Sequence, residues 1–185
     1  MPAVITFHMR WLSRLTKCGG SCICKNMDKK KQKDKCVIGV ISDTHGFLRP
    51  GVLKAFADVE HILHAGDLDT PRIIAELESI APVTAVRGNM DHGSWALDFP
   101  EHTSMNMGGW DIKMMHIPPD TETDNTKQRT IVIHGHTHTP REEWVDGTLM
   151  LNPGSAGPKR SHRIPTVALL HLAPDHAEVE FIELN

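Results

Sequence analysis

Acids and histidines that directly follow short apolar runs are the residues of this chain best suited to chemistry. Asp43 and His45 follow Val37–Ile41, a run rich in β-branched residues that is typical of a strand buried on both faces. Two residues apart on extended backbone, the two side chains point to the same side and can bind one metal ion together. Since ligands gather at the carboxyl ends of strands in open α/β sheets, this pair predicts a metal site at that edge.

The same kind of ending recurs along the chain. Later apolar runs end in a polar residue that can bind metal: Asp67, Asn89, His116, His136 and His138. Each of these residues alone is more typical of a turn or a helix cap. A succession of such endings at predicted strand termini favours one shared site. Asp, Asn and His donors suit two divalent ions such as Mn²⁺, Fe²⁺, Ni²⁺ or Zn²⁺.

Strands and helices must alternate to bring these endings together. His61–Ala65 and Val83–Val86 are predicted strands, and apolar residues recur at helical spacing over Arg49–Asp58 and from Pro71 to Ile80. Three strand-then-helix units in succession predict a parallel sheet with helices on its faces.

The second half of the chain has a different pattern. A hairpin is predicted around Gly108-Gly109, and Ile131–Ile133 is another buried strand. We expect an antiparallel meander from four alternating segments near the end of the sequence: Glu142–Val145, Thr148–Leu151, Thr166–Leu172 and Glu178–Ile182.

Length and charge set limits on the class of protein. The chain has 185 residues, enough for one domain with a sizeable core, and none of its apolar runs approaches the ~20 residues that span a bilayer. Residues 1–36 hold nine Lys or Arg against two Asp, whereas the remainder is acidic and the net charge is −3. We expect a basic, disordered extension over residues 1–35, with a targeting or membrane-surface helix as the alternative, before a domain at 36–185. The acidic domain disfavours nucleic acid as a partner.

The cysteines favour a cytoplasmic protein. All four lie within or beside the basic extension: Cys18, Cys22, Cys24 and Cys36. The predicted domain therefore has no internal disulfide framework, which suits a reducing compartment. Because no second ligand pair follows at finger-like spacing, we interpret these cysteines as free thiols rather than a zinc site.

An ordered set of motifs resembles a known family. The set comprises Asp43-Thr-His45, Gly66-Asp67, Gly88-Asn89-Met-Asp91, His116, Gly135-His136-Thr-His138 and Asn152-Pro-Gly-Ser155. It resembles the calcineurin-like metallophosphoesterase family, and within it the small prokaryotic phosphodiesterase branch. The resemblance covers about residues 37–183 and implies an α/β fold, a four-layer α/β/β/α sandwich with a dinuclear site at the carboxyl edge of its sheets.

The resemblance also implies which residues hold metal. One ion would take Asp43, His45, Asp67 and His138, and the other would take Asp67, Asn89, His116 and His136. Asp67 would bridge them, since two cations ~4 Å apart require an anion between them. Mn²⁺ is the favoured cofactor, with Ni²⁺, Fe²⁺ or Zn²⁺ as alternatives. The implied reaction is hydrolysis of a small phosphodiester by metal-activated water, and a homo-oligomer is left open.

Two departures from the family pattern concern the reaction. Many members carry a histidine that can protonate the leaving group directly after the Asn of the third motif, whereas this chain has Met90. The alternative acids are His45, Asp91 and His92, so Asp91 joins Asp67 and Asn89 as a candidate catalytic residue. The second departure is the Pro-Pro sequence that follows His116 where the family usually forms a helix, which makes His116 the least secure ligand.

Other functions are compatible with the same motifs. A non-catalytic protein-interaction scaffold is one, because the retromer subunit that resembles this branch kept the fold and lost ligands. A phosphomonoesterase is the nearest enzymatic alternative. A nuclease is disfavoured, because this chain lacks the extra domains and basic surface of the family's DNA-cutting members. Asp69 and Asn152 are candidates to orient ligating histidines.

Overall fold

The computed structural model describes residues 35–118, 129–158 and 164–184. The predictions for the basic extension before Lys35 therefore lie outside the described residues, and so do Cys18, Cys22 and Cys24. The departure expected after His116 is described only as far as Pro118. Within the described ranges no helix is long and apolar enough to cross a membrane.

The first sheet begins with three parallel strands, as predicted. Strands β1 (Cys36–Ile41), β2 (His61–His64) and β3 (Val83–Ala85) lie side by side in parallel. Strands β9 (Thr166–Ala173) and β10 (His176–Glu183) extend the sheet beyond β1 as an antiparallel hairpin, in the order β10-β9-β1-β2-β3. The sheet is therefore mixed rather than wholly parallel.

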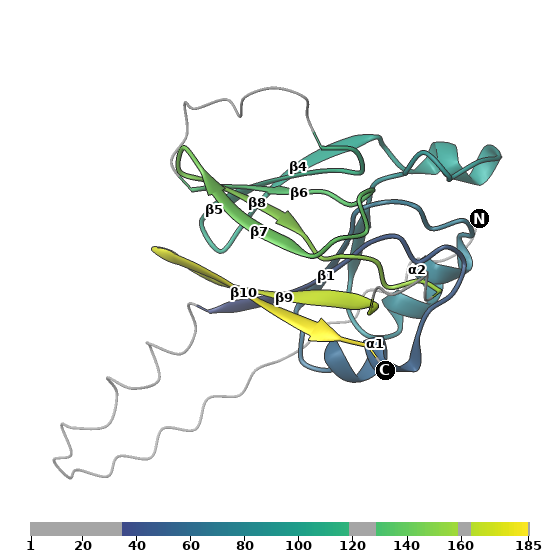
Figure 1. Cartoon of the computed structure of the whole chain (residues 1–185), viewed down its shortest axis with the longest axis horizontal. Helices are drawn as coiled ribbons and strands as arrows, with labels where there is room; N and C mark the ends of the chain where they lie inside the picture. Colours follow the sequence, from purple (N-terminus) through teal and green to yellow (C-terminus); the bar gives the residue numbers. More distant parts are fainter. Residues whose placement is uncertain (1–34, 119–128, 159–163, 185) are drawn as a thin grey trace, which may run out of the picture. The chain divides into compact units, whose positions relative to one another are not determined.

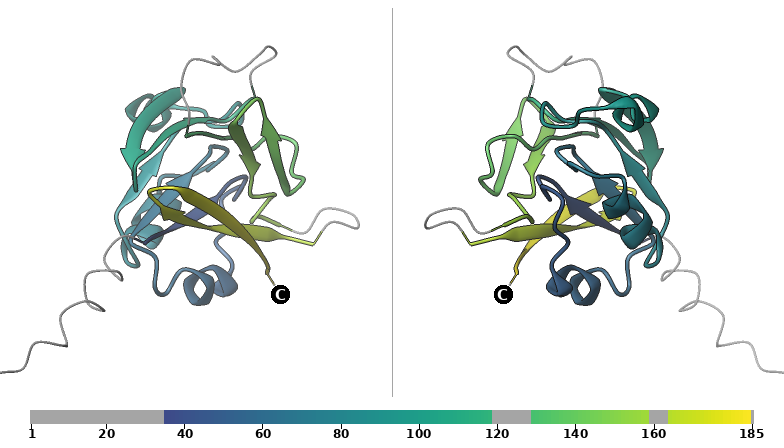
Figure 2. Two further views of the ribbon diagram at one scale, coloured as in Figure 1. Left: turned by 90° about the vertical axis from the view of Figure 1, so that its left-hand side faces the viewer. Right: turned by 90° about the vertical axis from the view of Figure 1, so that its right-hand side faces the viewer.

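Two short helices lie on the face of the first sheet that points away from the second (Figures 1 and 2). They are α1 (Pro50–Ala55) and α2 (Arg72–Glu78), which bury Val52 and Ile73 against that face, in one cluster with Ile41 of β1. Pro50 occupies the first turn of α1, where its missing N–H is not needed. The third strand is followed by a 3₁₀-helix, η1 (Ser94–Asp98), in place of the α-helix of a third unit.

The second sheet contains the predicted hairpin and the buried strand. It has the order β4-β5-β6-β8-β7. Its strands are β4 (His102–Met107), β5 (Trp110–Met115), β6 (Thr130–Ile133), β7 (Arg141–Val145) and β8 (Thr148–Asn152). Strands β5, β6 and β8 run parallel, whereas β4 and β7 pair antiparallel at the two edges.

The expected meander near the end of the sequence is wrong. Its four segments form two hairpins that belong to different sheets, since β8 pairs with β6 and β9 pairs with β1. Strand β7 is exposed at all five positions and β8 is buried at four of its five, whereas β9 alternates between buried and half-buried residues from Ala168 to Ala173. The pairing follows from the core, because Leu149 of β8 and Leu170 of β9 reach the same cluster from opposite sides.

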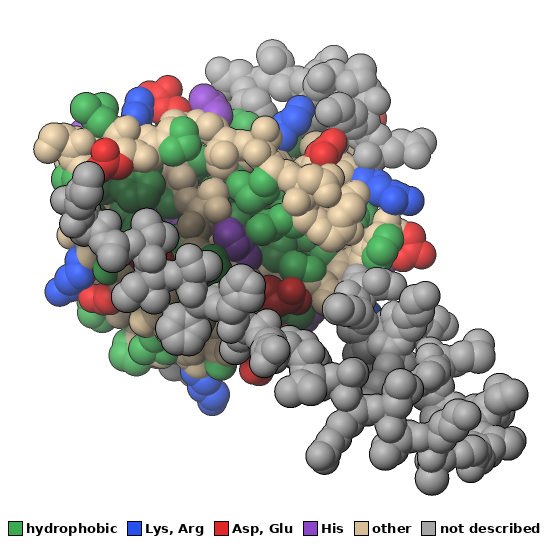
Figure 3. Space-filling view, turned by 180° about the vertical axis from the view of Figure 1, so that it is seen from behind, with side chains coloured by type: hydrophobic (Ala, Val, Ile, Leu, Met, Phe, Trp, Pro, Cys, Tyr) green, Lys and Arg blue, Asp and Glu red, His purple; other side chains and the backbone are tan. Residues whose placement is uncertain are grey.

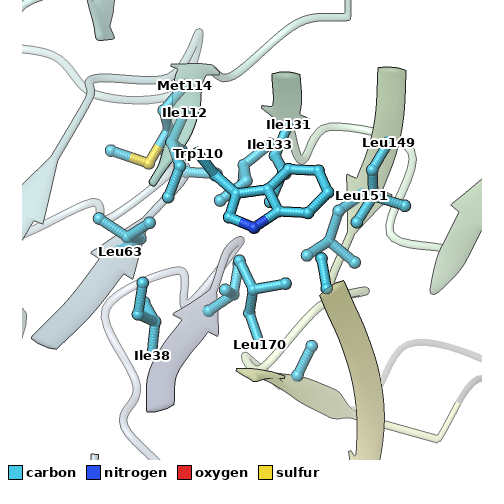
Figure 4. Close-up of a cluster of buried hydrophobic side chains, with 14 of the residues drawn as sticks. Ile38, Leu63, Trp110, Ile112, Met114, Ile131, Ile133, Leu149, Leu151 and Leu170 are labelled. Carbon is cyan, nitrogen blue, oxygen red and sulfur yellow. The ribbon is translucent and has the colours of Figure 1, made fainter. Parts of the chain in front are cut away.

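The core between the two sheets is apolar and centred on Trp110 (Figure 4). Ile38 and Leu170 reach it from the first sheet, and Ile112 and Leu149 from the second. The Trp110 indole N–H donates to the Ala173 carbonyl at 2.8 Å, so its one polar atom is satisfied across the core. Two packed sheets with helices on an outer face confirm the predicted α/β sandwich.

Candidate metal centre

The loops that leave the strands have an unusual backbone. Positive φ angles of 48–68° occur at five candidate ligands: Asp43, His45, Asp67, His136 and His138. A Cβ atom makes this left-handed region costly by roughly 1 kcal/mol per residue, although Asp, Asn and His tolerate it better than most residues. Such strained positions cluster where surrounding structure enforces a functional geometry. The backbone conformation of these loops is therefore one that the residues would rarely adopt by their own conformational preference.

Four of the candidate ligands form one compact cluster. Potential ligand atoms of Asp43, His45, Asp67 and His138 all lie within 4.8 Å of one another. His138 Nε2 lies 3.0 Å from Asp43 Oδ1 and 3.4 Å from His45 Nε2. His45 Nε2 in turn lies 4.0 Å from Asp67 Oδ2. Residues from the loops after β1, β2 and β6 thus converge on one point.

The other three candidates lie on the far side of Asp67. Asp67 Oδ2 is 3.3 Å from Nε2 of the buried His116. The His116 and His136 rings lie edge to face with centroids 5.4 Å apart, and His136 Nδ1 is 3.0 Å from Asn89 Oδ1. Asp67 Oδ2 therefore faces ring nitrogens of both groups of residues.

Nitrogen and oxygen atoms that can each bind a cation face one another at this centre. We assign the His116 proton to Nδ1, which donates to the Ala65 carbonyl at 2.7 Å, so Nε2 presents its lone pair to Asp67. Within the described residues, His116 Nε2 and Asp43 Oδ1 are the buried side-chain N or O atoms that make no hydrogen bond. A cation between such acceptors removes their repulsion, so the donor set fits divalent metal ions.

The surroundings of Asp67 favour a positive charge beside its carboxylate, and in the metal-free chain a proton on His116 Nε2 supplies that charge. Burial alone would raise the pKa of the Asp67 carboxyl, but the adjacent His116 and the Met90 backbone N–H, which donates to Asp67 Oδ1 at 2.9 Å, hold it below its usual value. Burial likewise lowers the pKa of His116, and the neighbouring Asp67 and Ala65 carbonyl reverse that effect and raise it. Asp67 is thus an anion suited to lie between two cations.

Asp69 and Asp91 have different places beside the centre. Asp69 Oδ2 lies 3.4 Å from His45 Nδ1, on the ring edge away from the cluster, where a carboxylate orients a ligating histidine. The Asp91 carboxylate accepts backbone N–H bonds from Gly88, Asp67 and Asp69 at 2.7, 3.0 and 2.7 Å. Asp91 therefore ties the loop after β2 to the loop after β3.

Glycines permit the close approach of these loops. A Cβ on Gly88 would lie 2.1 Å from Asp67 Oδ1, and one on Gly135 would lie 2.0 Å from Ser42 Oγ. Neither neighbour is free to move away, because Asp67 and Ser42 are both buried in the same loop cluster. A side chain at either position would therefore push a candidate ligand out of place.

A buried histidine, His64, holds two loops of the centre in place. His64 Nδ1 accepts the Gly66 N–H at 3.2 Å, so we assign its proton to Nε2, which lies 3.1 Å from Thr44 Oγ1. Burial lowers the pKa of His64 to about 4. His64 is thus a neutral residue that fixes the loops after β1 and β2 rather than a ligand.

The Asn152-Pro-Gly-Ser155 segment holds two of the loops. The Asn152 amide donates to the Gly135 carbonyl at 2.8 Å and to Thr137 Oγ1 at 3.0 Å, on either side of His136. Ser155 Oγ and the Gly157 N–H both bond the Asp43 carbonyl, at 3.1 and 3.0 Å. Asn152 positions a loop rather than a ligand ring.

Sequence reasoning placed some residues better than others. All seven predicted ligands meet at this centre, whereas Asp91 points into backbone and His92 is exposed. His64 was interpreted from the sequence as a structural residue, whereas the supporting roles of Thr44 and Gly157 were not predicted, because no spacing or motif distinguishes them from ordinary turn residues. The family resemblance of the Asn-Pro-Gly-Ser segment was the one signal that pointed to this side of the centre.

The surface carries no basic patch on the face shown in Figure 3. There the Lys and Arg side chains stand singly among acidic, polar and apolar ones. This distribution is unlike the continuous basic surfaces that bind nucleic-acid backbones.

Comparison with known proteins identifies the family. Residues 37–175 match the calcineurin-like phosphoesterase superfamily domain. The chain belongs to this superfamily. A probable metallophosphoesterase of Methanothermobacter thermautotrophicus is 35% identical over 159 residues, which are 79% of this chain and 91% of that protein. The membership predicted from the motifs is therefore confirmed.

Solved structures share the calcineurin-like fold described above. An archaeal phosphodiesterase aligns with a TM-score of 0.66 at 27% identity, over 80% of this chain and 99% of that one. Vacuolar protein sorting 29 of Cryptosporidium parvum aligns with a TM-score of 0.67 at 22% identity, over 82% of this chain and 92% of that one. At that lower identity the likeness concerns the fold alone.

Proposed function

We propose that this chain is a metal-dependent phosphodiesterase that hydrolyses small phosphodiesters at a two-metal centre. The convergence of Asp43, His45, Asp67 and His138 within 4.8 Å, with Asp67 also in contact with His116, carries the proposal. Membership of the calcineurin-like superfamily and the likeness to an archaeal phosphodiesterase support the choice of reaction.

The residues have distinct parts in this proposal. Asp43, His45 and His138 would hold one ion, Asn89, His116 and His136 the other, and Asp67 would contact both. Bound divalent ions, Mn²⁺ foremost, would supply activation of water and neutralisation of charge on the phosphoryl group. Asn89 contributes a neutral oxygen, which keeps the centre attractive to a phosphate anion.

Two neighbours of Asp67, Asp91 and Met90, hold it in position, and Met90 cannot donate a proton to the leaving group. Asp91 holds the Asp67 loop through backbone bonds, so we assign it a positioning role. Met90 orients Asp67 through its backbone N–H, while its side chain is half exposed and has no proton to donate. The proposal therefore favours substrates whose leaving group is stable as an anion.

Hydrolysis of bis(p-nitrophenyl) phosphate tests the proposal. The full chain is stripped of metal with a chelator and assayed with Mn²⁺ withheld or restored. We expect activity to return only with metal, and to be greater on this diester than on p-nitrophenyl phosphate. A preference for the monoester would instead identify a phosphomonoesterase.

The alternative function is a non-catalytic scaffold of the same fold. The fold shared with vacuolar protein sorting 29 is compatible with it, but a full set of competent ligand side chains disfavours it. The scaffold predicts that folded protein neither binds a divalent ion nor hydrolyses either ester. Elemental analysis of the purified chain after incubation with Mn²⁺ distinguishes the two.

A further inference from the structure

A hollow of about 300 Å³ opens directly beside the metal centre. It is lined by Asn89 and His116, two candidate ligands, together with Arg87, Glu101, His102 and Ile117. Cavities of about half this volume hold a benzene ring. A phosphodiester bound at the centre would therefore have room for one of its organic groups here.

The charged residues of the hollow cancel each other. The Arg87 guanidinium donates to Glu101 Oε1 at 2.8 Å and to the Phe99 carbonyl at 3.1 Å. The positive charge of Arg87 is therefore paired with a carboxylate within the hollow. The two hydrogen bonds also fix the guanidinium plane, and such planes stack on aromatic rings.

An apolar side chain also lines the hollow. Ile117 directly follows His116 and leaves 51% of its surface exposed at the mouth of the hollow. An exposed isoleucine gains free energy when an apolar group covers it. A fixed guanidinium and an isoleucine beside the same hollow thus suit a flat, uncharged ring.

We propose that this hollow binds an aromatic ester group of the substrate, which makes the chain selective for aryl-type over small alkyl phosphodiesters. The inference rests on the proposed phosphodiesterase function and specifies its substrate class. Ile117 and Arg87 are its specificity residues, and neither belongs to the metal centre.

Inhibition by two poor substrates tests the proposal. Methyl phenyl phosphate and dimethyl phosphate are measured as inhibitors of bis(p-nitrophenyl) phosphate hydrolysis by the Mn²⁺-loaded full chain. We expect the phenyl ester to bind roughly tenfold more tightly, and Ile117→Ala to remove most of that preference. Arg87→Lys keeps the charge and loses the flat plane, so it should reduce the preference about threefold.

Leu97→Ala is the matched control for Ile117→Ala. Leu97→Ala removes an apolar side chain that is 73% exposed on η1 and does not line the hollow, so the preference should remain as in wild type. Equal inhibition by both esters in wild type would overturn the proposal. So would an Ile117→Ala variant that weakens both inhibitors to the same extent.

A binding measurement separates this inference from the proposed function. In an NMR titration with the same two esters, the Ile117 methyl signals should shift with methyl phenyl phosphate and remain unchanged with dimethyl phosphate, while those of Ile38 in the core do not move. Absence of hydrolysis would refute the phosphodiesterase. Absence of a selective Ile117 shift would refute the aromatic site even in an active enzyme.

Discussion

The two halves of the candidate metal centre differ in how firmly the protein holds them. Asp43 is buried and His45 and His138 are half-buried; we call these three the buried half-site, and their ligand atoms lie within 4.8 Å of one another and of Asp67. Asn89, His116 and His136 form an open half-site, in which only His116 is buried. The buried half-site is organised by the fold alone, whereas the open one borders the hollow and faces solvent.

The backbone explains this difference. The loop after β1 is bonded to the loop after β2 through the Asp43 and His45 N–H groups, which donate to the Gly66 and Asp67 carbonyls at 3.0 and 3.1 Å. The exposed side chains of the open half-site contact each other through His136 Nδ1 and Asn89 Oδ1, and the His136 backbone N–H donates to Asp43 Oδ2 at 3.3 Å. We therefore expect tighter metal binding at the buried half-site.

Asp67→Asn should have the largest effect, because it removes the charge shared by both half-sites. We expect hydrolysis of the aryl diester to fall on the order of 10³-fold or more and bound Mn²⁺ to fall below one ion per chain. Kinetics and elemental analysis measure the two effects. Asp98→Asn, on the exposed side of η1, is the control, and wild-type activity in Asp67→Asn would exclude the two-metal mechanism.

Alanine at one histidine of each half-site tests the difference directly. We expect His138→Ala to weaken Mn²⁺ binding about 100-fold and His136→Ala about tenfold, since the buried half-site loses a preorganised ligand. Isothermal titration calorimetry of metal-free protein resolves the two. Equal losses would show that burial does not determine affinity here.

His64, which holds the loops of the buried half-site, should make the stability of the chain depend on pH. The pKa of His64 is about 4 in the folded chain against 6.5 for the ordinary side chain, so the unfolded chain binds the extra proton between these values. The contribution of the neutral His64 to the free energy of unfolding is fully present above pH 6.5. It decreases as the pH falls, by about 2 kcal/mol between pH 7 and pH 5. Urea unfolding at both pH values measures this contribution.

A variant identifies the source of that pH dependence. His64→Gln should lower stability at pH 7 and reduce the difference between pH 7 and pH 5 by about 2 kcal/mol. His176→Gln alters an exposed histidine in β10 and should leave the difference as in wild type. An unchanged difference in His64→Gln would assign the effect to other groups.

The smallest effect is expected from the carboxylate behind His45. Asp69→Asn weakens the partner of His45 Nδ1 and should reduce Mn²⁺ affinity at the buried half-site about tenfold, with the open half-site unaffected. Competition with a metal-sensing dye measures each constant. Asp175→Asn, in the β9–β10 turn, serves as the control, and a loss confined to the open half-site would contradict the assignment of Asp69 to His45.

Much of the fold and of the centre could be predicted from the sequence. Apolar runs that stop at Asp43, Asp67 and His136 mark strand ends, and parallel strands bring such ends to one edge. Strands β1, β2 and β3 and the β4–β5 hairpin followed from these patterns and from turn residues. The residue types alone indicated divalent metal rather than a thiolate site.

Only the tertiary structure decided which neighbours each residue has. Hairpins β7–β8 and β9–β10 look alike in sequence and join different sheets, because distant core residues select their partners. Asp91 could have faced substrate, but the approach of two loops at Gly88 turns its carboxylate onto backbone N–H groups. Local sequence determines where a strand ends and which donors follow it. Burial and long-range hydrogen bonding determine which donors face the candidate metal centre and which hold the loops in place.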